Sequence, residues 1–219
     1  TAGFSTIASQ EKQLGLSLIL GGCGATLEQL TAMYSAFADS GRYTPVVMLQ
    51  HEKPEHAAQV VSPAAAYMVS DILSQMHRPD LPYNFQNTTH LPKVAWKTGT
   101  SYGRRDAWSI GYNKTYTVGV WVGNFSGKGV PELNGAEMAT PVLFEVFNSI
   151  AYNSGNDWFQ PPAAISYRLI CSESGKLPEH FCNNRTSDMF IPMVSHNEKC
   201  MHEKTVFVST DEKISYCTA

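Results

Sequence analysis

Apolar residues along this chain are grouped in two kinds of pattern, one typical of strands and one typical of helices. Segments 106–112 and 115–122 are rich in β-branched and aromatic residues, which favours strands. The two residues between them, Asn113-Lys114, suit a hairpin connection. Together with segment 93–101 just before them, they predict three consecutive strands in the middle of the chain.

Polar residues that precede periodic apolar stretches predict where three helices begin. Thr26-Leu-Glu-Gln29 matches a capping box, with Gly41 as the stop, and Ser62-Pro63 and Thr140-Pro141 each place a cap residue before proline. The apolar side chains expected to face the core are Leu27, Leu30, Met33, Tyr34 and Phe37 in the first helix, Tyr67, Met68, Ile72, Leu73 and Met76 in the second, and Val142, Leu143, Val146, Phe147 and Ile150 in the third.

The composition of the chain changes after residue 156. Turn formers and prolines meet at Gln160-Pro-Pro162, and the part that follows shows short strand-like runs without a helical period. We therefore expect a first domain over residues 1–156, a linker over 157–162 and a small β domain over 163–219.

Composition narrows the range of functions. A hydrophobic content of 43% can fill a sizeable core, and a formal net charge of −3 offers no basic surface for nucleic acid. No apolar run approaches the roughly 18 residues that would cross a bilayer, and the first residues lack the pattern of a signal peptide. We expect a globular protein with no nucleic-acid partner.

The first of the three predicted strands has unusual chemistry. It carries Lys97-Thr98-Gly99-Thr100 where a buried strand would continue with apolar residues. Such a run suits a strand at the edge of a sheet that faces a cleft, where the glycine lets the backbone of a ligand approach closely. The same residues would also fit a solvated edge strand, with the lysine preventing aggregation.

That run, its continuation through Asp106-Ala-Trp108 and the strand Val118-Gly-Val-Trp-Val-Gly-Asn124 resemble the third signature of the penicillin-binding transpeptidases and serine β-lactamases. Segment 14–22 resembles the class A, bifunctional branch of these proteins. The resemblance covers residues 1–155 strongly. It implies an α/β (α+β) fold: a mostly antiparallel sheet flanked by helices, incomplete on its N-terminal side and followed here by the small all-β module.

The resemblance also implies roles for the residues of the unusual strand. Lys97 would supply positive charge near the reacting centre, and the Thr98 and Thr100 hydroxyls would bind the terminal carboxylate of a D-alanyl-D-alanine peptide. The main-chain N–H of Thr100 would be one of two oxyanion donors. Gly99 and Ser101 would complete the substrate-binding set.

The family's two other motifs are not found in the order that the family requires. Ser9-Gln-Glu-Lys12 fits Ser-x-x-Lys by letters only, because just 84 residues (13–96) separate it from Lys97 and because it stands directly before segment 14–22, which in the family follows both motifs. Ser154-Gly-Asn156 and Ser195-His-Asn197 fit Ser-x-Asn but come after the strand. We expect the nucleophile upstream of this chain and no acylation by the chain alone.

In the whole protein, the resemblance implies peptidoglycan cross-linking through a serine acyl-enzyme, with stem peptides and β-lactams as ligands and no cofactor. It places the site on the periplasmic face of the bacterial inner membrane, with a membrane anchor and a glycosyltransferase domain upstream. Two alternatives stay open: a D,D-carboxypeptidase or serine β-lactamase of the same fold, and a non-catalytic module that binds the cell wall or an unidentified protein partner.

Four of the five cysteines fall in the C-terminal segment and leave three uses open: two disulfides, a zinc site or buried free thiols. Sequential pairing would close two short loops, each contributing about 3 kcal/mol, and it fits an oxidising compartment. A Cys-x-x-Cys pair is lacking, although three histidines lie nearby, so we expect disulfides and no metal. The residues concerned are Cys171, Cys182, Cys200 and Cys217, with His180, His196 and His202.

Overall fold

The computed structural model describes residues 4–53, 56–75, 77–78, 81, 90–152, 157–180, 182–202, 206–211 and 215–218. The chain divides into two compact units, Thr1–Gln160 and Pro161–Ala219. Among the described residues, no helix has both the length and the apolar character needed to span a bilayer.

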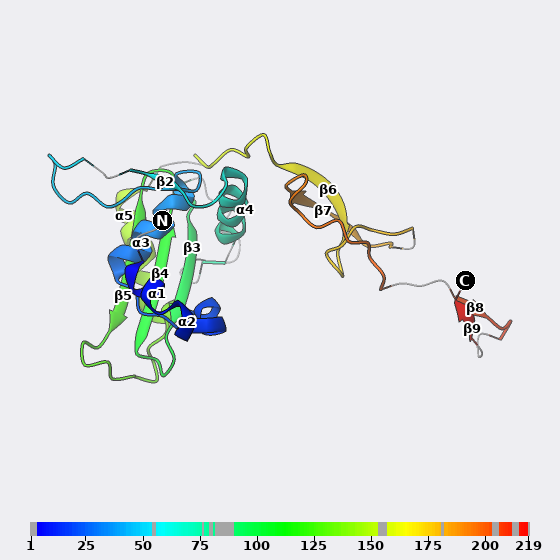
Figure 1. The fold of residues 1–219 in the computed structure, drawn as a ribbon, viewed down its shortest axis with the longest axis horizontal. Helices are drawn as coiled ribbons and strands as arrows, with labels where there is room; N and C mark the ends of the chain where they lie inside the picture. The colour runs from blue at the N-terminus through cyan, green and yellow to red at the C-terminus, as the bar shows by residue number, and fades with distance from the viewer. Residues whose placement is uncertain are drawn as a thin grey trace. The chain divides into compact units, whose positions relative to one another are not determined.

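The first unit is built on a three-stranded antiparallel sheet of β3 (Ala95–Thr100), β4 (Asp106–Tyr112) and β5 (Thr117–Gly123), in the order β3-β4-β5 (Figure 1). All three strands were expected from the sequence. Within this sheet β3 is an edge strand, as its polar run predicts. Its register on β4 places Trp96 opposite Gly111 and Gly99 opposite Trp108, which fixes the side chains that share a face.

Helices cover both faces of this sheet (Figure 1). The face that carries Ala95 and Tyr112 packs against α3 (Leu27–Ala38) and α4 (Pro63–Ser74), and we call it the α3 face. The opposite face, with Trp96, packs against α5 (Thr140–Ile150) and is called the α5 face. Among the described residues, this unit also contains α1 (Ser5–Ser9), α2 (Glu11–Leu14), the 3₁₀ turn η1 (Gly15–Leu20), the β1–β2 pair (Arg42–Tyr43 with Ala58–Gln59) and the π-helical turn η3 (Gly135–Ala139).

The predicted caps of α3 and α4 are present. Thr26 Oγ1 accepts from the Gln29 N–H at 3.1 Å, and the Gln29 side chain accepts from the Thr26 N–H at 3.0 Å. Ser62 caps α4 through the Ala65 N–H. These bonds satisfy N–H groups that a helix start leaves without partners, so the two helices begin at the residues that the sequence indicates.

The core of the α5 face differs in part from the predicted stripe. Leu143, Phe144 and Phe147 are fully buried, and the Phe144 ring meets Trp96 edge-on at 5.3 Å between centroids. Val142 and Ile150, expected inward, are 43% and 45% exposed. The stripe is shifted because α5 continues from η3, so Thr140 is a buried helical residue and not the expected cap; the cap is on Asn134.

The α3 face is organised around Tyr112, whose ring stacks on Phe37 at 6.1 Å and meets Tyr34 edge-on at 6.3 Å. Trp158 and Phe159, placed in the linker by the sequence, pack into this cluster and belong structurally to the first unit. On α4, Ile72 was expected in the core but is 62% exposed, and Met76 lies outside the described residues.

The second unit contains two antiparallel pairs, β6 (Ser166–Cys171) with β7 (Arg185–Phe190), and β8 (Val206–Val208) with β9 (Ser215–Thr218). The predicted mixture of helices and antiparallel strands, with strands in the C-terminal unit, is confirmed. Among its described side chains, the buried ones are Cys171, Cys182 and Cys200. This unit therefore lacks an aliphatic or aromatic core in its described part.

Candidate active site

The candidate site lies along the open edge of β3. Successive main-chain N–H groups of a strand point to opposite sides, and the Ser101 N–H points toward β4, where it donates to the Asp106 carbonyl at 3.0 Å. The N–H and C=O groups of Thr98 and Thr100 therefore point to the other side, where no strand of the described residues pairs with β3. These are the groups that a peptide could meet by adding a strand to the sheet.

Lys97 lies on this strand with an exposed side chain that starts on the α3 face. Its ammonium donates to the Thr98 carbonyl at 2.7 Å. Because that carbonyl belongs to the open edge, the positive charge lies at the same edge as the main-chain groups. An anionic group on a bound peptide would meet this charge in an exposed position.

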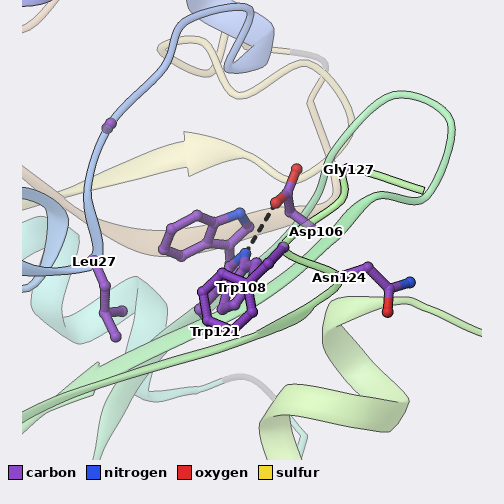
Figure 2. Close-up of a pocket in the computed structure, with 8 residues that line it drawn as sticks. Leu27, Asp106, Trp108, Trp121, Asn124 and Gly127 are labelled. Atoms are coloured by element: carbon purple, nitrogen blue, oxygen red, sulfur yellow. Dashed lines mark hydrogen bonds between the residues drawn. The ribbon is translucent and has the colours of Figure 1, made fainter. Parts of the chain in front are cut away.

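Gly99 lies opposite Trp108 in the register of β3 on β4, and Trp108 is one of the residues that line a surface hollow of about 480 Å³. A methyl group on Gly99 would come within 3.5 Å of Trp108 Cβ, a normal contact, so local crowding does not require glycine here. Figure 2 shows Trp108 and Trp121 side by side in the hollow, with Leu27 across from them. Trp108 thus lines an open hollow on the α3 face.

Gly135, a residue that the sequence analysis did not single out, holds the side chain of Thr100. Its Oγ1 accepts from the Gly135 N–H at 3.0 Å, which leaves the hydroxyl proton of Thr100 to donate elsewhere. A Cβ at position 135 would lie 2.6 Å from the Gly99 carbonyl oxygen and 2.5 Å from that of Trp108. The turn η3 can therefore approach the back of β3 only through glycine.

A short buried polar chain continues this support. The Thr140 hydroxyl contacts Ser109 Oγ at 3.1 Å and donates to the Gly135 carbonyl at 2.9 Å. The only sequence signal for this contact is a lone glycine beside Asn134 in an irregular segment, which gives no indication of its distant partner. The β3 strand is positioned from its back face by η3 and α5.

Ser101 serves the turn that follows β3. Its Oγ accepts from the N–H groups of Arg105 and Asp106 at 3.2 and 2.8 Å, so both bonds point into the turn and away from the open edge. The Asp106 carboxylate accepts from Trp121 Nε1 at 2.9 Å, as the dashed line in Figure 2 shows. The Arg104 guanidinium donates to the Pro131 carbonyl.

The segments that match Ser-x-x-Lys and Ser-x-Asn by letters only are not part of the strand that forms the candidate site. Ser9 is the last residue of α1 and Lys12 belongs to α2, so they lie in separate helices. Ser195 belongs to the second unit, and Ser154 lies outside the described residues. The described site thus consists of an edge strand with a cation, hydroxyls and outward main-chain groups.

Comparison with known proteins gives the family. Residues 5–146 match the family described as "Penicillin binding protein transpeptidase domain". The chain belongs to the penicillin-binding transpeptidase family. Penicillin-binding protein 1C of Escherichia coli (strain K12) is 40% identical over 169 residues, which cover 75% of this chain and 21% of that protein. The family predicted from the extended Lys-Thr-Gly strand is confirmed.

Two further proteins resemble this chain. Penicillin-binding protein 1A of Clostridium tetani is 24% identical over 212 residues, which cover 88% of this chain and 26% of that protein. The crystal structure of penicillin-binding protein 1A from Haemophilus influenzae matches 84% of this chain and 35% of its own with a TM-score of 0.69 at 17% identity, which shows the fold. The chain spans about a fifth to a quarter of the length of these curated relatives.

Proposed function

We propose that β3 is the substrate-binding strand of a D-alanyl-D-alanine transpeptidase that cross-links peptidoglycan through a serine acyl-enzyme. In this proposal the Ser-x-x-Lys and Ser-x-Asn motifs precede the chain in a protein that also polymerises glycan. The observation that carries the proposal is the open edge, where the Thr98 and Thr100 main-chain groups and the Lys97 ammonium meet. The family match to a transpeptidase domain supports it.

Each part of the reaction has a candidate group on β3. A stem peptide would add to the open edge as a strand, its terminal carboxylate near the Lys97 ammonium and the hydroxyls of Thr98 and Thr100. The outward N–H of Thr100 would donate to the oxyanion that forms when serine attacks the D-alanyl carbonyl. Because the Thr100 oxygen already accepts from Gly135, its hydroxyl is oriented to donate. Ser101 is less suited to the substrate-binding role because its oxygen serves the turn.

The test is the rate at which a labelled penicillin acylates the full-length protein. Lys97→Ala should lower that rate about 100-fold or more, the scale of losing a preorganised electrostatic group near a developing oxyanion. Lys128→Ala, which removes an equally exposed lysine beyond β5, should leave the rate unchanged. Acylation that survives Lys97→Ala would place the cleft elsewhere.

Two controls separate the alternatives. The 219-residue chain alone should stay unlabelled, and a stoichiometric adduct on Ser9 would overturn the assignment of its motif as coincidental. Product analysis separates the reaction types, because a transpeptidase yields cross-linked dimers whereas a D,D-carboxypeptidase yields trimmed monomers. A non-catalytic wall- or partner-binding module would keep its binding unchanged in Lys97→Ala.

The proposed ligands are peptidoglycan stem peptides and β-lactams, which resemble the terminal D-alanyl-D-alanine. The proposed location is the periplasmic face of the bacterial inner membrane, held by an anchor outside this chain. Fluorescence microscopy of the tagged full-length protein, with protease accessibility in spheroplasts, tests this location. Digestion only after lysis of the inner membrane would contradict it.

A further inference from the structure

The second unit brings four potential metal ligands together. Cys171, Cys182, Cys200 and His202 place one ligand atom each so that all four lie within 4.8 Å of one another. The three thiols are buried, with exposures of 1–3%. Their sequence spacing shows no Cys-x-x-Cys pair, so the fold brings them together. Cys171 is the last residue of β6, and β7 begins shortly after Cys182. A bridge between Leu177 and Lys199 places Cys200 beside them.

The four ligand atoms lie within about 1 Å of the separations that a tetrahedral zinc ion requires. Zinc bonds of about 2.3 Å to sulfur and 2.0–2.1 Å to nitrogen imply about 3.8 Å between two sulfurs and about 3.6 Å between sulfur and nitrogen. Cys171 Sγ lies 3.7 Å from His202 Nδ1, close to the tetrahedral value, whereas Cys200 Sγ lies 2.5 Å from the same nitrogen, about 1 Å less than that value. The largest separation, 4.8 Å, exceeds the tetrahedral value by about 1 Å, so small side-chain movements would complete the shell.

The surroundings of the cluster are those of a metal site. His202 turns Nδ1 toward the sulfurs and Nε2 toward the Glu173 carboxylate at 3.2 Å, the arrangement in which a carboxylate orients a ligating imidazole. The Ser174 hydroxyl donates to the Cys200 sulfur at 3.1 Å. Donors of this kind stabilise thiolates, the form that binds metal.

The number and identity of the ligands point to one metal in a structural role. Three thiolates and one imidazole make a closed Cys₃His set, typical of structural zinc, and leave no position for a reacting water. Three thiols cannot all form disulfides among themselves. A Cys171–Cys182 bond would leave Cys200 beside His202, and its predicted partner Cys217 has a side chain outside those that the structure describes. The sequential disulfides therefore stay a prediction that competes with this one.

The few buried side chains among the described residues of the second unit are a further reason to expect a stabilising metal ion there. Its described part buries these three cysteines and no aliphatic or aromatic side chain, so in this module of 59 residues (219 − 160) apolar burial within the described part contributes little to stability. Structural zinc supplies folding free energy directly in modules of this size. We propose that Cys171, Cys182, Cys200 and His202 bind one zinc ion that holds the second unit together.

Zinc alone is the probe in the first experiment. The 219-residue chain, isolated without reductant from an oxidising compartment and dialysed, should contain about one zinc per chain by elemental analysis. X-ray absorption at the zinc edge should give a first shell of three sulfurs and one nitrogen. This readout needs no variant and so stands even if ligand variants fold poorly. A shell of oxygens, or of sulfurs only, would overturn the ligand set.

Matched variants then test each ligand. Cys182→Ser and His202→Gln should each lower the zinc content at least about tenfold, whereas Cys23→Ser and His196→Gln should retain it. Glu173→Gln should weaken zinc affinity about tenfold through the orientation of His202, and Glu179→Gln, whose carboxylate pairs with Lys199, should leave affinity unchanged. Equal losses in the two members of any of these three pairs would overturn the proposal.

Cys217→Ser distinguishes zinc from the predicted disulfides. If zinc is bound as proposed, this variant keeps its metal, and the three ligand cysteines become titratable thiols only after denaturation with a chelator. Protein without zinc that lacks free thiols in the second unit under denaturing conditions would show disulfides in place of the metal. Loss of zinc in Cys217→Ser would assign Cys217 a ligand role and overturn the Cys₃His set.

Discussion

Tyr112 shows how one buried polar side chain ties the sheet to α4. Its ring is fully buried, and its hydroxyl lies 2.9 Å from Ser70 Oγ. Ser70 donates its own proton to the Ala66 carbonyl at 2.8 Å, so the tyrosine is the donor in the shared bond. Burial raises the pKa of Tyr112 to about 12, above its ordinary 10.0.

This residue predicts a loss of stability at alkaline pH. A pKa raised by folding means that the protonated tyrosine stabilises the native state below about pH 10, and that this contribution is lost as pH rises through about 12. Urea unfolding across this range should show a steeper decline for the unaltered protein than for Tyr112→Phe. Tyr116→Phe, at a 42% exposed position, should behave like the unaltered protein. Parallel declines in all three proteins would contradict the assignment to Tyr112.

At the scale of elements, the contact between β3 and η3 decides the position of the candidate site. Gly135→Ala would insert a methyl group 2.5–2.6 Å from two carbonyl oxygens, so β3 or η3 must shift. We expect a loss of about 1–3 kcal/mol in unfolding free energy, measured by denaturant titration of the first unit. Gly24→Ala, where an added Cβ meets nothing within 4 Å, is the matched control and should change little. Equal stability of both variants would show that the contact is unimportant.

Sequence patterns predicted the elements whose information is local. The caps at Thr26 and Ser62 and the three central strands depend on residues within a few positions of one another, and these were confirmed. Gly135 escaped prediction because its role is defined by carbonyls of β3 and β4 that are distant in sequence. The cysteine–histidine cluster escaped prediction for the same reason, because its members come together only where β6 and β7 pair.

At the scale of the whole molecule, the chain joins two units that bury different kinds of side chain. The first buries aromatic and aliphatic side chains on both faces of its sheet, and the second buries cysteines in its described part. A denaturant acts in proportion to the surface that unfolding exposes. The two units should therefore respond differently to the same treatment.

Hydrogen exchange of each unit during urea titration tests this difference. The first unit should lose protection in a steep transition, whereas Pro161–Ala219 should open in a shallow one whose midpoint falls when a zinc chelator is added. Chelator should leave the first unit unchanged. A steep urea transition in the second unit, insensitive to chelator, would contradict the proposed metal and the expectation drawn from the cysteine-only burial in the described part of this unit.

The three buried cysteines also set how the second unit responds to temperature. Heat capacity rises on unfolding because apolar surface meets water, and this unit has little such surface to expose in its described part. Its stability curve should be nearly flat from cold to warm, with no pronounced optimum. An organism that grows over a wide temperature range would thus keep this tail equally folded throughout, at a stability governed by the supply of its ion.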